Sequence, residues 1–452
     1  MALILGTGST KPTYPYDQWY GVQGDFSSTD AVLTRVGNLD LHRTLPIQSK
    51  MRRFVENTDG SVKYYLHQND SRKMDSGAAA ILDSTDGNVM LEVPEHYFKF
   101  EVSGTKWTFC LSEYPLPGFV KIRRRTISPW GCTVDNVNNT VVSGSWLTWS
   151  GDEVAKDSDG LPIFTDNATQ FRGGANDSSR DGTTKSGVGM CRTAISRTSM
   201  RNYSKNGTHV GSFRAYNTIK WFYRVEYANM NCQAAYNASL TTEGYHQGGL
   251  GQGTAFSGSD WNSHNGYYPF IPCGVTAPLG NNTGLVSYTI NLTQGGTKTF
   301  QVQSYRGFEV PFEYIWLNCD DVLIHHSPDT KQAQSIAYLC DDPSLFVTPS
   351  NTQEAVPTGY EAETELPRAS CYPKYEEVDT LNEAGFPAVS GGSSTTGICD
   401  YFYHPGATAD GWYVALFAGR AGDGAPAGFG YLNTIYRPAD TNANFGFRLC
   451  RF

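Results

Sequence analysis

The chain has 452 residues, and at about 150 residues per domain this predicts about three domains, or fewer if one is large and rich in loops. The 35 Lys and Arg against 44 Asp and Glu give a net charge of −9, which argues against a nucleic-acid groove or an anionic membrane surface as the main partner. Charged residues make up only 17% and aromatic residues 13%, and 47 glycines are present, which excludes a disordered chain and indicates strands, turns and ordered loops.

The first residues carry no targeting signal of the usual kind. The segment 1–6 has no basic region, and its apolar run is too short for a cleaved signal peptide. Elsewhere no apolar run approaches the ~18–20 residues of a membrane helix. We therefore expect a protein made in the cytoplasm without a signal peptide and without membrane insertion.

The N-terminal quarter is predicted to be an arm followed by short strands. Residues 1–30 contain Gly and Pro without a period, which is typical of an arm that docks onto a partner, or of a frayed terminus. Between residues 31 and 125 the pattern alternates, and the runs 96–102 and 106–112 around Ser103-Gly104 predict a hairpin. The segment 130–190 is rich in turn residues and predicts an inserted loop region.

Two helices are expected next. Ser196 or Thr198 can cap a short helix that stops at Asn206-Gly207. The run 216–236 carries a wide apolar belt, which predicts a mostly buried helix. Glu226 lies within that belt and should have a polar partner. Because strands and glycine loops follow to the end, the pattern predicts an α+β fold.

Several motifs that could carry chemistry fail on inspection. The loop 248–254 has neither a phosphate-loop ending nor dinucleotide spacing, so we expect a tight loop of glycines with positive φ. His325 and His326 would point to opposite faces of a strand and cannot hold one metal ion together. The run 440–444 lacks the glycine and glutamate of a calcium loop, although a calcium ion held by loop carbonyls stays possible.

The remaining polar patterns give no catalytic assignment. Arg123–Arg125 is the only basic run and is too short for a nucleic-acid footprint. The sequence has no Gly-x-Ser-x-Gly elbow, and its carboxylates are not paired by spacing, although spacing cannot reveal every catalytic dyad. Ten cysteines are spread thinly and predict buried thiols, with Cys399 and Cys450 the first pair to check for a bond. We predict no catalytic residue, metal or cofactor.

The C-terminal segment 399–452 has the composition of a binding surface. An apolar strand at 412–417 is followed by loops of Gly, Ala, Asn, Tyr and Arg, and then by a last strand near 446–451. Small residues combined with Tyr, Trp and Arg anchors are typical of binding surfaces. The alternative is a glycine-rich pair of core strands.

Several segments, taken in order, resemble a known family. They are Tyr97–Phe119, the helix Lys220–Ala228, the segment Tyr305–Trp316, Gly391–Ser393, the strand Trp412–Phe417, and the ending Asn444–Cys450. In this order they resemble the C-type-lectin-like fold shared by formylglycine-generating-enzyme-like domains, the variable proteins of diversity-generating retroelements, and phage tail proteins of the major tropism determinant type. The resemblance covers about residues 90–452.

The resemblance has departures. The segment 305–316 is similar to the family pattern Arg-Gly-x-Glu-Asn-Pro-x-Gly-x-x-Trp, but Val310 stands in place of Asn and Glu313 in place of Gly. The enzyme branch of the family uses a cysteine pair near its C-terminal part, and no matching pair is present here. We therefore carry over no catalytic residue.

The resemblance implies a C-type-lectin-like α+β fold with long loops and insertions. It implies an N-terminal arm and β-rich virion-attachment region at 1–85 and a lectin-like domain at 86–452, with 130–190 inserted. Carried over by position, the segment 399–452 would be the variable ligand-binding region, and the ligand-facing residues would be Trp412, Tyr413, Arg420, Asp423, Tyr431, Asn433 and Tyr436.

The function that follows from the resemblance is a phage tail-tip or tail-fibre adhesin. It would bind a glycan or protein receptor on the bacterial surface, attach to other phage tail proteins through its N-terminal region, form a homotrimer, and reside in the virion. The alternatives are a structural virion protein, such as a head fibre or tail collar, and a formylglycine-generating-like or glycan-modifying enzyme. A cell-surface variable protein would need an export route.

Overall fold

The structure is a computed structural model. It describes residues 16–135, 138–145, 155–156, 162–163, 197–257, 271, 273–291, 297–378, 385–442 and 444–452. The first fifteen residues of the predicted arm and most of the predicted insertion at 130–190 lie outside the described residues.

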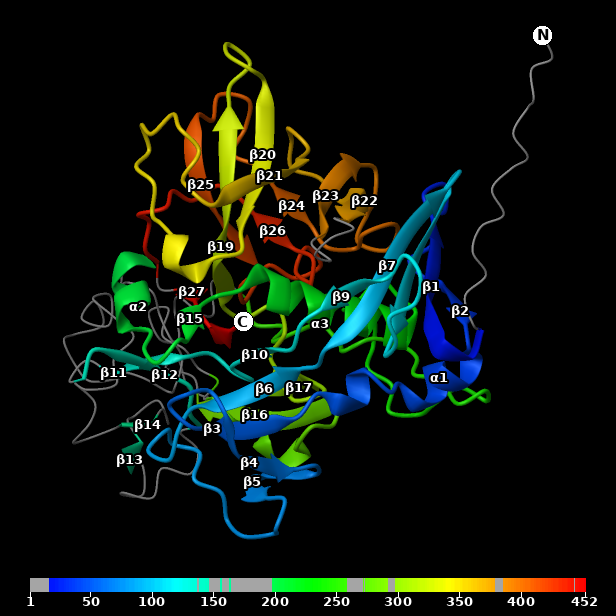
Figure 1. Ribbon diagram of the computed structural model, residues 1–452, viewed down its shortest axis with the longest axis vertical. Helices are drawn as coiled ribbons and strands as arrows, with labels where there is room; N and C mark the ends of the chain where they lie inside the picture. Colours follow the sequence, from blue (N-terminus) through cyan, green and yellow to red (C-terminus); the bar gives the residue numbers. More distant parts are fainter. Residues whose placement is uncertain are drawn as a thin grey trace.

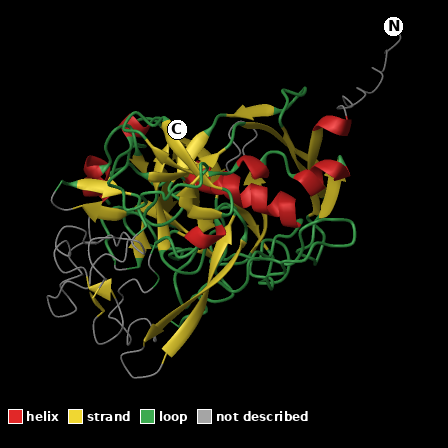
Figure 2. Ribbon diagram, turned by 90° about the horizontal axis from the view of Figure 1, so that it is seen from below, coloured by secondary structure: helices red, strands yellow, loops and turns green. Residues whose placement is uncertain are grey.

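Strands dominate the molecule. They hold 39% of the residues against 11% in helices, so the predicted α+β class is wrong and the fold is β-rich, with several antiparallel sheets. Figure 2 shows few helices among many strands. The described helices are α1 (Leu39–Thr44), α2 (Arg197–Tyr203) and α3 (Phe213–Tyr227). The prediction failed because helical periodicity is confined to short segments, and only α3 is long enough to pack against several sheets.

The N-terminal sheet has five strands in the order β2-β1-β8-β7-β9. Their bounds are β1 Trp19–Asp25, β2 Thr34–Gly37, β7 His96–Ser103, β8 Lys106–Ser112 and β9 Val120–Ile122. The predicted hairpin is confirmed as β7 and β8, which pair from Tyr97↔Ser112 to Ser103↔Lys106. Residues 19–25, expected in the arm, are an interior strand because β1 pairs with both β2 and β8.

A second sheet has seven strands in the order β15-β28-β10-β6-β3-β4-β5. Its strands are β3 Arg53–Glu56, β4 Val62–His67, β5 Asp70–Met74, β6 Val89–Val93, β10 Arg125–Ile127, β15 His209–Val210 and β28 Leu449–Arg451. The expected domain boundary at residues 85/86 does not separate two sheets, because β3 pairs with β6 in this sheet and β1 with β8 in the first.

The C-terminal sheet runs in the order β21-β20-β19-β25-β26-β24, with β27 also paired to β19. Its strands are β19 Trp316–Ser327, β20 Gln334–Cys340, β21 Tyr360–Glu365, β24 Phe402–Tyr403, β25 Gly411–Phe417, β26 Leu432–Asn433 and β27 Phe445–Gly446. The β24–β26 and β19–β27 pairs are parallel.

Smaller sheets and turns complete the description. One three-stranded sheet contains β16 Gly284–Asn291, β17 Thr297–Tyr305 and β18 Phe308–Glu309. The two-stranded sheets are β11 Thr133–Asp135 with β12 Thr140–Val142, β13 Ala155–Lys156 with β14 Pro162–Ile163, and β22 Pro373–Val378 with β23 Gly385–Ser390. The 3-10 turns are η1 Tyr16–Gln18, η2 Gln48–Lys50, η4 Ala277–Leu279 and η5 Pro343–Leu345.

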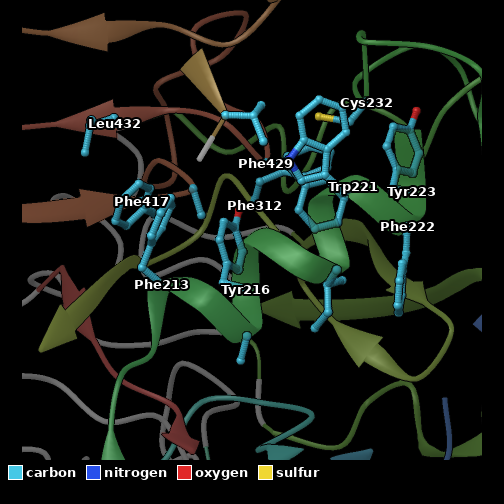
Figure 3. Close-up of a cluster of buried hydrophobic side chains, with 14 of the residues drawn as sticks. Phe213, Tyr216, Trp221, Phe222, Tyr223, Cys232, Phe312, Phe417, Phe429 and Leu432 are labelled. Carbon is cyan, nitrogen blue, oxygen red and sulfur yellow. The ribbon is translucent and has the colours of Figure 1, made fainter. Parts of the chain in front are cut away.

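Helix α3 forms the centre of the core. Ser212 caps it through a hydrogen bond from Ala215 N–H, and Ala228 ends it in the left-handed conformation at φ 49°. In Figure 1 the helix lies between the C-terminal sheet and the strands β6 and β10. All fifteen of its residues are buried, and Figure 3 shows its aromatic side chains packed against residues from other segments. The expected helix at 216–236 thus begins earlier and ends nine residues sooner.

The polar partner expected for Glu226 is present in the core. Arg306 Nη2 donates to Glu226 Oε1 at 2.9 Å, and Tyr305 Oη donates to Oε2 at 3.0 Å. Glu226 is buried, so the bidentate guanidinium offsets the cost of removing the carboxylate from water. This contact ties the segment 305–316 to α3.

Helix α2 and the state of the cysteines largely agree with the predictions from sequence. Helix α2 ends at Tyr203, and Asn206 and Gly207 both have positive φ at 56° and 74°. All nine described cysteines are free thiols and eight are buried, so Cys399 and Cys450 do not form a bond with each other. None of the described helices is both long enough and apolar enough to cross a membrane.

Candidate functional site

Four of the seven predicted ligand-facing residues are part of the core. Trp412, Tyr413, Tyr431 and Asn433 are buried, none with more than 5% of its surface exposed. Strand β25 lies between β19 and β26, and all seven of its residues are buried. These side chains therefore support the C-terminal sheet and cannot contact a ligand, which corrects the expectation for them.

The loop after β25 carries the predicted residues that reach the surface. Arg420 is exposed and Asp423 is half-buried, and their side chains form an ion pair at 3.2 Å. The Arg420 N–H also donates to Asp423 Oδ2 at 2.9 Å. Tyr436 is half-buried and packs edge-on against Phe445 at 4.7 Å. The structure thus brings Arg420 and Asp423 together in one tight loop.

A polar cavity of about 280 Å³ opens beside this loop. It lies where five loop segments meet, and we call it the Glu313 cavity. Its walls are Asn231, Gln233, Gln252, Ala255, Glu313, Ser394, Thr395, Gly424 and Ala425. Amides, hydroxyls and one carboxyl dominate this wall, and such groups can exchange hydrogen bonds with a hydroxyl-rich or amide-rich ligand.

Among the described residues of that wall, Glu313 is the only one with an ionisable side chain. It is buried with 1% exposed, and its Oε2 accepts from Ala255 N–H at 2.9 Å and from Thr254 Oγ1 at 3.1 Å. Burial raises its pKa to about 7, in spite of these hydrogen bonds, which act to lower it. The carboxyl therefore changes charge near neutral pH.

The main chain around the Glu313 cavity is held by specific contacts. Gln233 Nε2 donates to the carbonyl oxygens of Gly424 at 3.0 Å and Ala425 at 3.1 Å, which fixes the loop that carries Arg420. The Gly422 N–H donates to Glu313 Oε1 at 3.3 Å. The loop is therefore attached both to the loop that follows α3 and to the segment before β19, which preorganises the cavity.

The glycine loop at 248–254 explains how the chain approaches Glu313 closely. Gly248, Gly251 and Gly253 have positive φ, as predicted. A Cβ on Gly253 would lie 2.4 Å from the Glu313 side chain, so only glycine permits this approach. The loop is a structural support for the Glu313 cavity.

Sequence reasoning missed Glu313 and Gln233 as site residues. Gln233 lies in a loop without a recognisable pattern, and nothing in its neighbours could have identified it. For Glu313 a signal existed, because it occupies the position where the resembling family has Gly. Its φ of 58° is the left-handed conformation that glycine adopts readily.

The described residues contain no group of three His, Cys, Asp or Glu side chains arranged to hold a metal ion. His326 instead bonds to Ser335 Oγ at 2.8 Å and to the Thr434 carbonyl at 3.2 Å, while His325 packs edge-on against Trp412. Asp440 accepts from the Arg437 N–H at 2.7 Å, as expected for a turn.

Comparison of the chain with protein-family models, with curated proteins and with solved structures gives no match. The structure itself shows a β-rich protein with a preorganised polar cavity beside an exposed loop.

Proposed function

We propose that the protein is a receptor-binding protein of a phage tail, and that it binds a polar receptor group of the bacterial surface at the Glu313 cavity. The observation that carries the proposal is the cavity of about 280 Å³ beside the Arg420–Ala425 loop, whose wall is built from amides, hydroxyls and one carboxyl. A wall of this kind suits a glycan or a polar protein loop. The exposed Arg420 lies on the same loop, and its ion pair with Asp423 helps to hold that loop beside the cavity.

Local conformation supports the kinship with variable phage tail proteins. The segment 305–316 departs from their pattern at Val310 and Glu313, and both residues have positive φ, at 42° and 58°. Asn and Gly, which the family carries there, are the residues that adopt this conformation most readily. The backbone of this segment would therefore accept the Asn and Gly of the family pattern, although the side chains here differ.

The proposal includes the assembly that this kinship implies. The protein would reside in the tail of the virion, attach to other tail proteins through its N-terminal region, and act as a homotrimer. Three copies of one cavity would bind repeated surface groups with higher avidity than a single copy.

The test is adsorption of the purified protein to intact candidate host cells. Ala425→Trp places a large ring at the mouth of the Glu313 cavity, from an exposed loop position. Ala407→Trp is the matched control, because it makes the same change at an exposed alanine in another loop of the C-terminal segment.

We expect the wild type and Ala407→Trp to bind alike, and Ala425→Trp to lose about tenfold or more in apparent affinity, as when a central contact is blocked. Equal binding by both variants, with both shown to be folded, would place the receptor site elsewhere. Adsorption by none of the proteins to any candidate host would contradict a receptor-binding function.

A second candidate function rests on Glu313 alone. A carboxyl that titrates near pH 7 suits general acid-base chemistry, so a glycan-modifying enzyme is the alternative. Incubation with host capsule or surface glycan distinguishes the two. Release of shorter saccharides by the wild type and not by Glu313→Gln would favour the enzyme over a binding protein without turnover.

A further inference from the structure

A second cavity, of about 240 Å³, lies on another side of α3. It is bounded by β1, β7 and β8 of the N-terminal sheet, by α3, and by β22. We call it the aromatic cavity, because five of its lining residues are Phe26, Phe100, Trp107, Trp221 and Tyr375. It shares no lining residue with the Glu313 cavity.

The aromatic walls are held rigidly. Trp221 stacks on Phe109 with ring centroids 4.2 Å apart, and its ring meets Trp107 edge-on at 6.0 Å. Phe26 packs against Tyr375 at 4.3 Å. The walls need no large rearrangement to receive a ligand, which lowers the entropic cost of binding.

A glycine shapes the same wall. Gly24 pairs with Trp107 across β1 and β8, and a Cβ on Gly24 would lie 2.3 Å from the indole ring. The absence of a side chain at residue 24 lets the Trp107 ring lie flat over the neighbouring strand. The Trp107 ring thus covers Gly24 and also lines the cavity.

The charges at the aromatic cavity balance. Asp25 and Asp30 contribute two carboxylates, and Lys106 and Lys374 two ammonium groups. The fifth charged group, Glu376, is buried between two cations: it accepts from Lys220 Nζ at 2.8 Å and from Arg224 Nη1 at 2.7 Å. The buried carboxyl of Asp400 also interacts with Arg224, so two carboxyl groups face these two cations. Neither a cation nor an anion therefore gains net Coulomb energy at this rim.

The ligand that fits these walls is neutral, with an apolar face and a polar edge. A volume of about 240 Å³ exceeds the engineered cavity of about 150 Å³ that admits benzene, so one six-membered ring fits. A pyranose ring offers C–H bonds to aromatic faces through dispersion, and its hydroxyls can exchange hydrogen bonds with both carboxylates and ammonium groups.

We infer that the aromatic cavity is a saccharide-binding site for one neutral hexopyranose unit, stacked against the aromatic walls with its hydroxyls at the Asp25 and Lys106 rim. This site is separate from the Glu313 cavity, so the inference does not rest on the proposed function.

The test uses the full chain and methyl glycosides of glucose, galactose, mannose and N-acetylglucosamine, with saturation-transfer NMR as the readout. Choline serves as the cationic probe and indole-3-acetate as the anionic one. Val32→Trp blocks the cavity from a lining residue that is 62% exposed, and Tyr375→Ala removes a half-buried wall. Val356→Trp is the matched control at an exposed valine outside the cavity.

We expect at least one glycoside to bind the wild type, and its affinity to fall by about tenfold or more in Val32→Trp and in Tyr375→Ala. Val356→Trp and Ala425→Trp should bind it as the wild type does. The inference is overturned if no glycoside binds, if binding survives Val32→Trp, or if only choline or indole-3-acetate binds. Loss of host adsorption in Ala425→Trp with retained glycoside binding would separate the two cavities.

Discussion

Replacement of Glu313 by glutamine should change how the stability of the protein depends on pH. In the folded state burial raises the pKa of this carboxyl from 4.5 to about 7, while in the unfolded chain it titrates at its ordinary value. Between these two pH values the folded state holds a proton that the unfolded state has lost. Wild-type stability must therefore fall as pH rises through this window.

The size of the effect follows from the two pKa values. At about 1.4 kcal/mol per pH unit, the interval from 4.5 to about 7 corresponds to about 3 kcal/mol of lost stability above pH 7. Glu313→Gln removes this loss but leaves the Gly422 N–H without its carboxylate acceptor, which costs about 1 kcal/mol. The variant should therefore be about 2 kcal/mol more stable at pH 8 and about 1 kcal/mol less stable at pH 4.

Thermal unfolding of both proteins from pH 4 to pH 8 measures this. An unfolding entropy of about 2 cal/mol/K per residue gives a chain of 452 residues about 1 kcal/mol/K, so the difference in Tm should change by about 3 °C across the range. Glu354→Gln, at a carboxyl whose side chain is 83% exposed, is the control and should show no such change. If the difference between wild type and Glu313→Gln is the same at every pH, the carboxyl is not buried as described.

Three further predictions test the core. Glu376→Leu removes the carboxylate that both Lys220 and Arg224 contact and should lower the free energy of unfolding by about 3–5 kcal/mol in urea titration; a loss no larger than that of Glu354→Leu would refute the buried ion group. Trp412→Ala should cost about 3–5 kcal/mol because the ring is fully buried, whereas an unchanged Tm would mean that the ring faces solvent. Dithiothreitol should leave the Tm unchanged, since the described cysteines are free, and a fall in Tm would reveal a disulfide.

The sequence predicts local structure where one pattern dominates. The apolar belt around Ile219 and Phe222 identified the buried helix, and the isolated Glu226 within it correctly implied a polar partner. The glycine spacing at 248–254 correctly implied positive φ. In each case the information lies within a few neighbouring residues.

The predictions that failed concern features that depend on contacts between distant segments of the chain. The side chains of Tyr413 and Tyr431 have the composition of a binding surface, yet the neighbouring strands of the C-terminal sheet bury both. No local pattern shows that β25 is an interior strand, because its neighbours β19 and β26 come from separate parts of the chain. The Glu313 cavity likewise forms from five loop segments that meet only in the folded protein.

The position of β28 has a consequence for the order in which the protein folds. This strand, Leu449–Arg451, lies between β10 and β15, and its neighbour Arg448 bonds to Ser128, 320 positions earlier in the chain. The second sheet therefore cannot close until residues 449–451 have left the ribosome. Until then the edge of β10 that pairs with β28 stays unpaired. Folding of this sheet is therefore expected to be slow, and removal of residues 449–451 would prevent the sheet from closing instead of removing only a binding surface.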